Sequence, residues 1–279
     1  MSVTEQHDTA PVSAALTFRV LPPGLYARRS RALVERALLV NRAAWLTLLS
    51  GFFEPLFYLV AFQVGFGQLI EQVRGPGGQL ISYVAFVAPG LLACSAMNGA
   101  VYDATFNVFF KLRYAKLYDA VLATPLGPLD VAIGEISWAL LRGGLYAVAF
   151  ILVMLGMGLL GSAWAVLLLP AALLIAFAFA AVGMAATTFI RSTQDFGLIQ
   201  LAVIPMFLFS TTFYPLRVYP RPLQVVVECF PLYHAVELIR RLATGFVDVG
   251  LLGHVAYLLV MVAIGVVFAA RRLSRLLLR

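Results

Sequence analysis

The fold is decided by residues Gly143–Ile190, whose sequence is GGLYAVAFILVMLGMGLLGSAWAVLLLPAALLIAFAFAAVGMAATTFI. These 48 residues include no Asp, Glu, Lys or Arg. A single helix of this length would measure about 72 Å, more than twice the ~30 Å hydrocarbon core of a bilayer. The stretch therefore predicts two membrane-spanning helices joined by a turn at Gly156–Ser162, where three glycines lie close together.

The composition extends this interpretation to the whole chain. Of its 279 residues, 62% are hydrophobic and 12% are charged, whereas about a quarter of the residues in an average soluble domain are charged. A soluble protein cannot hide so many apolar side chains without very large exposed patches. We therefore predict an all-α integral membrane protein and exclude soluble, fibrous and disordered proteins.

Further apolar windows bring the prediction to six transmembrane helices. The first 42 residues contain no such window, and residues 1–25 are predicted to be a cytoplasmic tail. Residues 271–279 are predicted to be a second, basic tail. The expected transmembrane domain is 26–270, with spans at about 46–70, 80–102, 131–157, 162–190, 196–216 and 249–270.

The positions of the basic residues indicate the orientation in the membrane. The formal net charge is +7, which in a soluble protein would suggest nucleic-acid binding. In a membrane protein, positive charge marks the cytoplasmic side instead. With both termini inside, 15 of the 20 Lys and Arg residues fall on the cytoplasmic side and five outside. We therefore predict cytoplasmic N and C termini and no nucleic-acid partner.

Residues 26–45 predict an amphipathic helix on the cytoplasmic membrane surface. At 100° per residue, the charged residues fall within about 160° of arc and most apolar residues face the other way. Basic helices of this kind bind the anionic inner leaflet. A simple charge anchor is the alternative interpretation. The basic residues expected on the polar face include Arg28, Arg29, Arg31 and Arg36.

The connection Asp103–Asp130 is the longest polar-rich loop between the early predicted spans. Its aromatic residues alternate with charges, which is typical of a short amphipathic helix that docks into a groove on another protein. Aromatic packing at the membrane interface is the alternative. Asp103 and Asp119 are expected to be solvated loop carboxylates.

Residues Arg217–Phe246 predict an extracellular element that is neither a span nor a simple loop. Three prolines interrupt this segment, and its charges are too many for a free span. A pair of short helices dipping into the outer leaflet accounts for both features. Non-helical backbone at membrane depth must be buried in protein or line a cavity. We therefore expect a re-entrant helical hairpin that caps a pathway before the last span.

The sequence lacks the motifs of catalysis. Neither lysine follows a glycine, so the Gly-Lys-Ser/Thr end of a P-loop is missing. His234-x-x-Glu237 supplies half of a zinc-protease ligand set at best, and a Gly-x-Ser-x-Gly motif is absent. We expect no enzymatic activity, no metal and no cofactor in this chain.

One carboxylate lies inside a predicted span. Glu54, followed by Pro55, is about a third of the way along the first span, and ionisable residues within a membrane are costly and often functional. A contact between helices or subunits is the favoured role, with substrate binding or proton transfer as alternatives. Glu135 and Arg142, two helical turns apart, are expected to pair with neighbours or reach the interface rather than contact substrate.

This layout resembles the membrane subunit of a type-2 ABC exporter. Three segments carry the resemblance: Thr124-Pro125-Leu126, the run Pro205–Pro215, and the pattern Pro231-Leu232-x-His234-x-x-x-Leu238-Ile239-Arg240. The last is similar to permeases of nodulation-factor (lipo-oligosaccharide) exporters, a subgroup that includes drug-resistance exporters. Thr211 departs from the family pattern, since many relatives have glycine at this turn.

The resemblance implies a complex in a bacterial inner membrane. Two permeases, identical or related, would associate with two copies of a separate ATPase that binds ATP and Mg. The loop Asp103–Asp130 would contact the ATPase, and the first, second and fifth spans would line the substrate path. The residues expected in this coupling are Lys111, Arg113, Lys116, Tyr118, Asp119, Thr124 and Pro125.

The implied function is export of an amphipathic or lipid-linked substrate, either a glycolipid or polysaccharide or a hydrophobic drug. The alternative is a self-sufficient proton-coupled secondary transporter, for which Glu54 is the main candidate. Aromatic and hydroxyl residues near the end of the fifth span are expected to line or gate the outer mouth, with ordinary packing as the alternative. These residues are Phe207, Phe209, Ser210, Thr211, Thr212, Phe213, Tyr214 and His234.

Overall fold

The computed structural model describes residues 37, 45–67, 69–70, 72–114 and 128–277. Some predicted elements lie outside these residues, as does the side chain of Glu54. They comprise the 1–25 tail, most of the amphipathic helix 26–45 with Arg28, Arg29, Arg31 and Arg36, and the loop residues Lys116, Tyr118, Asp119, Thr124 and Pro125.

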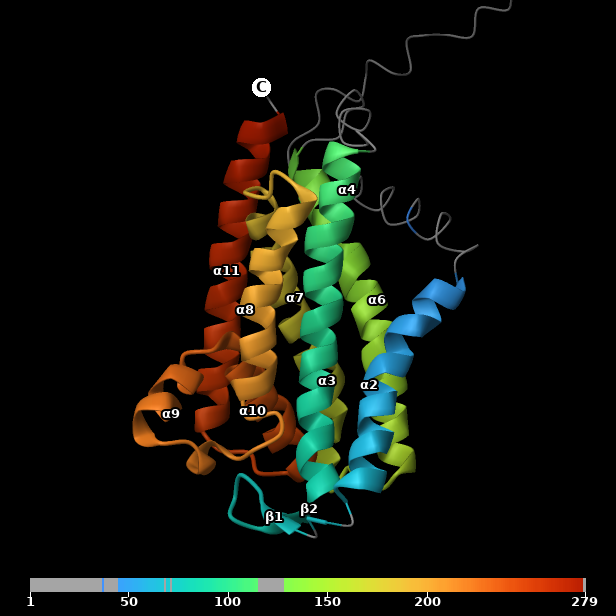
Figure 1. The fold of residues 1–279 in the computed structure, drawn as a ribbon, viewed down its shortest axis with the longest axis vertical. Helices are drawn as coiled ribbons and strands as arrows, with labels where there is room; N and C mark the ends of the chain where they lie inside the picture. Colours follow the sequence, from blue (N-terminus) through green and yellow to red (C-terminus); the bar gives the residue numbers. More distant parts are fainter. Residues whose placement is uncertain (1–36, 38–44, 68, 71, 115–127, 278–279) are drawn as a thin grey trace, which may run out of the picture.

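The described residues form an elongated bundle of helices (Figure 1). Helix α4 and the end of α11 lie at one end of the bundle, here called the α4 end, and a β-hairpin lies at the other, here called the hairpin end. The long helices are α2 (Trp45–Gly65), α3 (Tyr83–Tyr102), α6 (Pro128–Gly156), α7 (Leu168–Thr187), α8 (Phe196–Phe209) and α11 (Gly250–Leu277). The other elements are the helices α4 (Val108–Arg113), α9 (Arg221–Glu228) and α10 (Pro231–Thr244) and the strands β1 (Gln72–Arg74) and β2 (Leu80–Ser82). The two strands pair antiparallel.

Several of these helices are suited to a membrane. Helices α9 and α10 form a bent pair at 85° that counts as one further candidate span, and α2 and α8 contribute shorter apolar helices. The predicted all-α membrane fold is confirmed, while the count of six spans stays a prediction. Within the described part of the chain, the helices long and apolar enough to cross a bilayer are Tyr83–Arg113, Asp130–Gly156, Ala163–Thr187 and Gly250–Arg272.

Helix α7 holds the bundle together, because it packs against α11, α3 and α6. Its buried face is rich in alanine, and small residues let helix backbones approach closely in a membrane. At Gly183, an added Cβ would lie 3.2 Å from the Ala104 Cβ and 3.3 Å from the Thr105 Cγ2. This close contact fixes the far end of α3 against α7.

The turn predicted at Gly156–Ser162 is confirmed. Helix α6 ends at Gly156, and Gly158 has a φ of 67°, a left-handed conformation that glycine adopts at little cost. Ser162 then accepts a hydrogen bond from the Trp164 N–H and begins the short 3-10 turn that leads into α7. The Gly161 N–H donates to the Ala243 carbonyl of α10 at 3.3 Å, which ties this turn to the hairpin end.

The second helix extends further than predicted. After Tyr102 the chain continues through a π-helical turn, Asp103–Asn107, into α4 and ends at Arg113. The Ala104 carbonyl in this turn accepts a hydrogen bond from the Thr187 hydroxyl of α7 at 2.9 Å. The segment is polar enough to resemble a loop, yet it stays helical because its polar groups find partners on neighbouring helices.

Other boundaries also differ from the prediction. Residues 80–82 form strand β2 and do not belong to the second helix, helix α8 ends at Phe209 instead of residue 216, and α11 continues to Leu277 through most of the basic tail. The two short helices expected within Arg217–Phe246 are present as α9 and α10, each with proline in its first turn. Their insertion into the outer leaflet stays a prediction.

One arginine joins the elements at the hairpin end. Arg240 of α10 is only 1% exposed, and its guanidinium lies 3.8 Å from the centre of the Phe86 ring. It donates hydrogen bonds to the carbonyls of Phe86 at 3.1 Å and Thr211 at 2.6 Å, and to the Glu237 carboxylate at 2.8 Å. Arg240 therefore links α10 to α3 and to the segment that follows α8.

The segment after α8 contains a strained residue. Thr211 has a φ of 58°, and among the described residues it is the one non-glycine with positive φ. This conformation costs a β-branched residue roughly 1–2 kcal/mol. Its buried hydroxyl also has no hydrogen-bond partner within the described part of the chain. Glycine at this position would remove both costs.

Replacing Thr211 by glycine is therefore expected to stabilise the protein by about 1 kcal/mol, after the loss of a buried methyl group and the greater chain entropy of glycine are subtracted. The check is a thermal unfolding curve in detergent. The matched control is Thr212→Gly, which removes a hydroxyl in contact with the Cys94 Sγ at 3.4 Å and should lower the midpoint. A lower midpoint for Thr211→Gly would contradict the strain argument.

Candidate functional site

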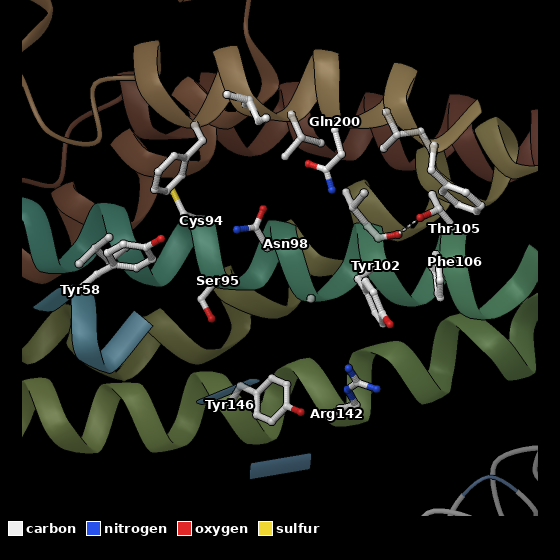
Figure 2. A pocket seen from close by; sticks show the side chains of 18 residues that line it. Tyr58, Cys94, Ser95, Asn98, Tyr102, Thr105, Phe106, Arg142, Tyr146 and Gln200 are labelled. Atoms are coloured by element: carbon white, nitrogen blue, oxygen red, sulfur yellow. Dashed lines mark hydrogen bonds between the residues drawn. The ribbon is translucent and has the colours of Figure 1, made fainter. Parts of the chain in front are cut away.

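An open cavity of about 660 Å³ lies beside α3. Its walls come from α2, α3, the π-helical turn, α6 and α8 (Figure 2). The predicted first, second and fifth spans correspond to α2, α3 and α8, so the cavity lies among the helices expected to line the path. Helix α6 adds a wall that the resemblance did not imply.

Helix α3 and the π-helical turn that follows it present a row of polar side chains to the cavity. Ser95, Asn98, Tyr102 and Thr105 are spaced by three, four and three residues, and this spacing places side chains on one face of a helix. The Thr105 hydroxyl donates to the Val101 carbonyl at 2.6 Å. The row therefore runs along α3 inside a helix that is otherwise apolar.

Helix α8 faces this row with an amide of its own. In Figure 2, the side chains of Asn98 and Gln200 point into the space between α3 and α8. The described residues offer no hydrogen-bond partner to Ser95, Asn98 or Gln200. Asn98 is half-buried and Gln200 is exposed, so both amides are free to bind a polar ligand or water inside the cavity.

Apolar and aromatic side chains complete the walls. Tyr58 comes from α2, Phe106 from the π-helical turn, Tyr146 from α6, and Phe196 and Phe207 from α8. Aromatic rings offer flat apolar faces that suit sugar rings and hydrophobic ligands alike. The cavity is thus amphipathic, with hydrogen-bonding groups set among large apolar surfaces.

One ion pair lies beside the cavity, on the side of the α4 end. Arg142 of α6 lines the cavity, and its Nη1 lies 3.1 Å from Oδ1 of Asp103. Asp103 is 5% exposed and also accepts a hydrogen bond from the Asn107 amide. The prediction of a solvated Asp103 is wrong, because the helix continues through this residue and turns it toward α6. Arg142 pairs as predicted, but it also reaches the cavity.

A second ion pair lies farther toward the α4 end. The Lys111 Nζ of α4 donates to Oε2 of Glu135 on α6 at 2.6 Å. Lys111 therefore has a partner within the chain, as was predicted for Glu135. Arg113 is exposed on the last turn of α4, so within the described residues it is the coupling-loop cation most accessible to another protein.

The residues predicted at the outer mouth do not form one group. Phe207 lines the cavity, and Phe213 packs against Phe207 and Phe62, with ring centres 5.3 Å and 5.1 Å apart. The hydroxyl residues Ser210, Thr211 and Thr212 are buried, whereas Phe209 and Tyr214 are exposed.

His234 lies apart from these residues, against the last helix. Its Nδ1 is 2.9 Å from Nδ1 of His254, and its ring stacks on Tyr257 with centres 3.9 Å apart. Tyr257 in turn donates to the Cys229 carbonyl at 2.9 Å. These contacts join α10 to α11.

The backbone of Glu54 lies within helix α2, as predicted for the first span.

Sequence reasoning missed the polar residues of the cavity. Ser95 and Asn98 stand in the apolar window of the second span and Gln200 in that of the fifth. The available signal was their polarity inside these windows, since a polar side chain in a membrane helix usually has a partner.

A bundle of such apolar helices, with an amphipathic cavity among them, defines a multi-pass membrane protein. The model of the ABC-2 type transporter family matches residues 29–244, and the chain belongs to this family. It is the membrane permease of an ABC exporter.

Curated relatives support the assignment. Nodulation protein J from Rhizobium leguminosarum bv. trifolii is 32% identical over 242 residues, which cover 86% of this chain and 90% of the relative. Nodulation protein J from Rhizobium leguminosarum bv. viciae is 29% identical over 244 residues, covering 86% and 91%. That from Rhizobium meliloti (strain 1021) is 30% identical over 216 residues, covering 76% and 80%.

Proposed function

We propose that this permease moves an amphipathic or lipid-linked substrate out of the cell, driven by ATP hydrolysis in two copies of a partner ATPase. The observation that carries the proposal is the cavity of about 660 Å³, which combines amide and hydroxyl groups with aromatic walls. A purely hydrophobic cargo would leave Asn98 and Gln200 without partners. A fully polar substrate would make no hydrophobic contacts with the apolar walls.

A glycolipid or polysaccharide is favoured over a hydrophobic drug. Amides, hydroxyls and aromatic rings are the groups that bind sugars through hydrogen bonds and ring stacking. Two similarities support this choice. The sequence pattern resembles permeases of lipo-oligosaccharide exporters, and the curated relatives are named Nodulation protein J. A drug would use the same aromatic faces but not the row of polar groups on α3.

The exporter is expected to contain two permeases in a bacterial inner membrane, with both termini in the cytoplasm. Lys111 and Arg113 at the α4 end, and Arg271 and Arg272 near the end of α11, support this orientation, because positive charge favours the cytoplasmic side. Closure of the ATPase dimer would act on α4 and the loop that follows it. The movement would then pass along the α3 helix to the cavity.

The direct test is purification of the tagged chain from its native membrane in mild detergent, followed by mass spectrometry. A P-loop ATPase recovered near one-to-one is the expected result, and a second permease in the sample would indicate a heterodimer. Vesicles with the recovered complex should accumulate substrate only with ATP. Transport without an ATPase, driven by a proton gradient, would overturn the proposal and favour secondary transport with Glu54 as the first candidate.

Charge reversal at Arg113 is expected to reduce ATPase recovery about fivefold, because losing an interfacial charge pair and creating a repulsive one weakens binding by about 1 kcal/mol or more. The measurement is quantitative co-purification. The matched control is Arg74→Glu on β1 at the hairpin end, where the arginine is also exposed, and it should leave recovery unchanged. Unchanged recovery with Arg113→Glu would refute the coupling role of α4.

The Lys111–Glu135 pair needs a separate design, since reversal of Lys111 alone also breaks a contact within the permease. Exchanging the two residues, Lys111→Glu with Glu135→Lys, retains the pair and reverses the surface charge of α4. If this exchange lowers ATPase recovery while the unfolding midpoint stays unchanged, the lost interaction is with the ATPase.

A further inference from the structure

The charge of the cavity is balanced inside the protein. Among the described residues that line it, Arg142 is the one charged side chain. Asp103 neutralises it across 3.1 Å, and the next pair toward the α4 end, Lys111 with Glu135, is neutral as well. The polar groups that remain are uncharged amides and hydroxyls.

The position of Asp103 is fixed by the surrounding structure. It lies at the start of the π-helical turn, whose Ala104 carbonyl is held by Thr187 of α7. Asn107 donates to the same carboxylate oxygen that faces Arg142. Contacts with α7 and with Asn107 therefore hold the Asp103 carboxylate beside Arg142.

This arrangement disfavours anionic ligands. A phosphate or carboxylate that entered the cavity would be a net charge in a medium of low dielectric, and the Arg142 cation is already compensated. A neutral ligand brings no net charge into this medium and so avoids this free-energy cost. It could also accept hydrogen bonds from the Asn98 and Gln200 amides, which line the cavity.

We propose that Asp103 determines the charge class of the substrate: by neutralising Arg142, it makes the cavity select an uncharged head group rich in hydroxyl or amide groups over a phosphate or carboxylate. Asn98 and Gln200 supply the hydrogen bonds to this head group. The inference rests on the proposed function, because it takes the cavity as the substrate site.

The test measures binding to the permease in nanodiscs of uncharged lipid. The probes are dodecyl maltoside and dodecyl phosphate, each with the same fluorophore at the end of the alkyl chain, and empty nanodiscs give the background. At pH 8 the phosphate is almost fully doubly charged, since its second pKa is about 6. We expect the wild-type chain to bind the maltoside about tenfold more tightly than the phosphate.

Asp103→Asn leaves Arg142 uncompensated, so its preference is expected to reverse toward the phosphate. The double variant Asp103→Asn with Arg142→Gln is neutral again and should return to the maltoside. Asp103→Glu keeps the negative charge and should bind as the wild type does. Asn98→Leu should weaken maltoside binding about fivefold, as expected for one lost hydrogen bond to a neutral group.

Equal or tighter binding of the phosphate by the wild-type chain would overturn the proposal, even if the Asp103→Asn chain does not fold. An unchanged preference in a folded Asp103→Asn chain would also overturn it. The assay contains no ATPase. A failure of the proposed function would therefore show as missing ATPase in the native purification, whereas a failure of this inference would show only in the probe preference.

Discussion

Replacing Arg240 by alanine is expected to lower the free energy of unfolding by about 3–5 kcal/mol, as is typical when one partner of a buried ion pair is removed. The side chain is 1% exposed and contacts three separate parts of the chain. Its removal would take a donor away from the carbonyls of Phe86 and Thr211, and would leave the Glu237 carboxylate with only the more distant Arg241. A buried acceptor that loses its partner costs far more than the net value of the bond.

Lysine is not expected to rescue this position. The guanidinium of Arg240 is planar, lies over the Phe86 ring and directs separate N–H groups at acceptors on α3, α10 and the segment after α8. A lysine ammonium is a compact charge that cannot reproduce the fork of donors. Arg240→Lys should therefore recover less than half of the lost stability.

Thermal unfolding and the yield of folded protein in detergent would measure these effects. Arg241→Ala is the matched control on the same helix: Arg241 is more exposed and pairs with Glu237 and Asp248 near the surface, so its loss should cost about 1 kcal/mol or less. Equal losses of stability for Arg240→Ala and Arg241→Ala would contradict the claim that Arg240 joins α10 to α3 and to the segment after α8.

Gly265 is the second position where a small change is expected to have a large effect. This residue of α11 is buried against α7, and an added Cβ would lie 2.8 Å from the Ala181 carbonyl carbon and 2.9 Å from the Val182 nitrogen. Backbone atoms cannot move aside as a flexible side chain can. Gly265→Ala is therefore expected to destabilise the protein by about 1–3 kcal/mol, the usual cost of overpacking.

Gly253 provides the control on the same helix. No heavy atom lies within 4 Å of a Cβ added there, and the residue is exposed. Gly253→Ala should be neutral or stabilise the protein by up to about 1 kcal/mol, because alanine favours a helix more than glycine does. Both variants can be compared by thermal unfolding in one detergent. A Gly265→Ala midpoint at or above that of Gly253→Ala would refute the close packing of α11 on α7.

The candidate site could be predicted only in part. Phe207 was placed at the path from its aromatic run, and it lines the cavity. Asn98 and Gln200 were missed, because a single polar residue in an apolar window does not reveal which way its side chain faces. The facing direction depends on how α3 and α8 are rotated within the bundle.

The local sequence determined that this chain forms membrane helices and where the chain turns at Gly156–Ser162. Both follow from the length of an apolar run relative to the bilayer thickness and from the backbone freedom of glycine, which are properties of neighbouring residues. Tertiary structure alone decided that Asp103 is buried beside Arg142 and that Arg240 holds the turn at Thr211. These partners are distant in sequence, and a charged group becomes stable inside the bundle only where packing brings its partner within hydrogen-bonding distance.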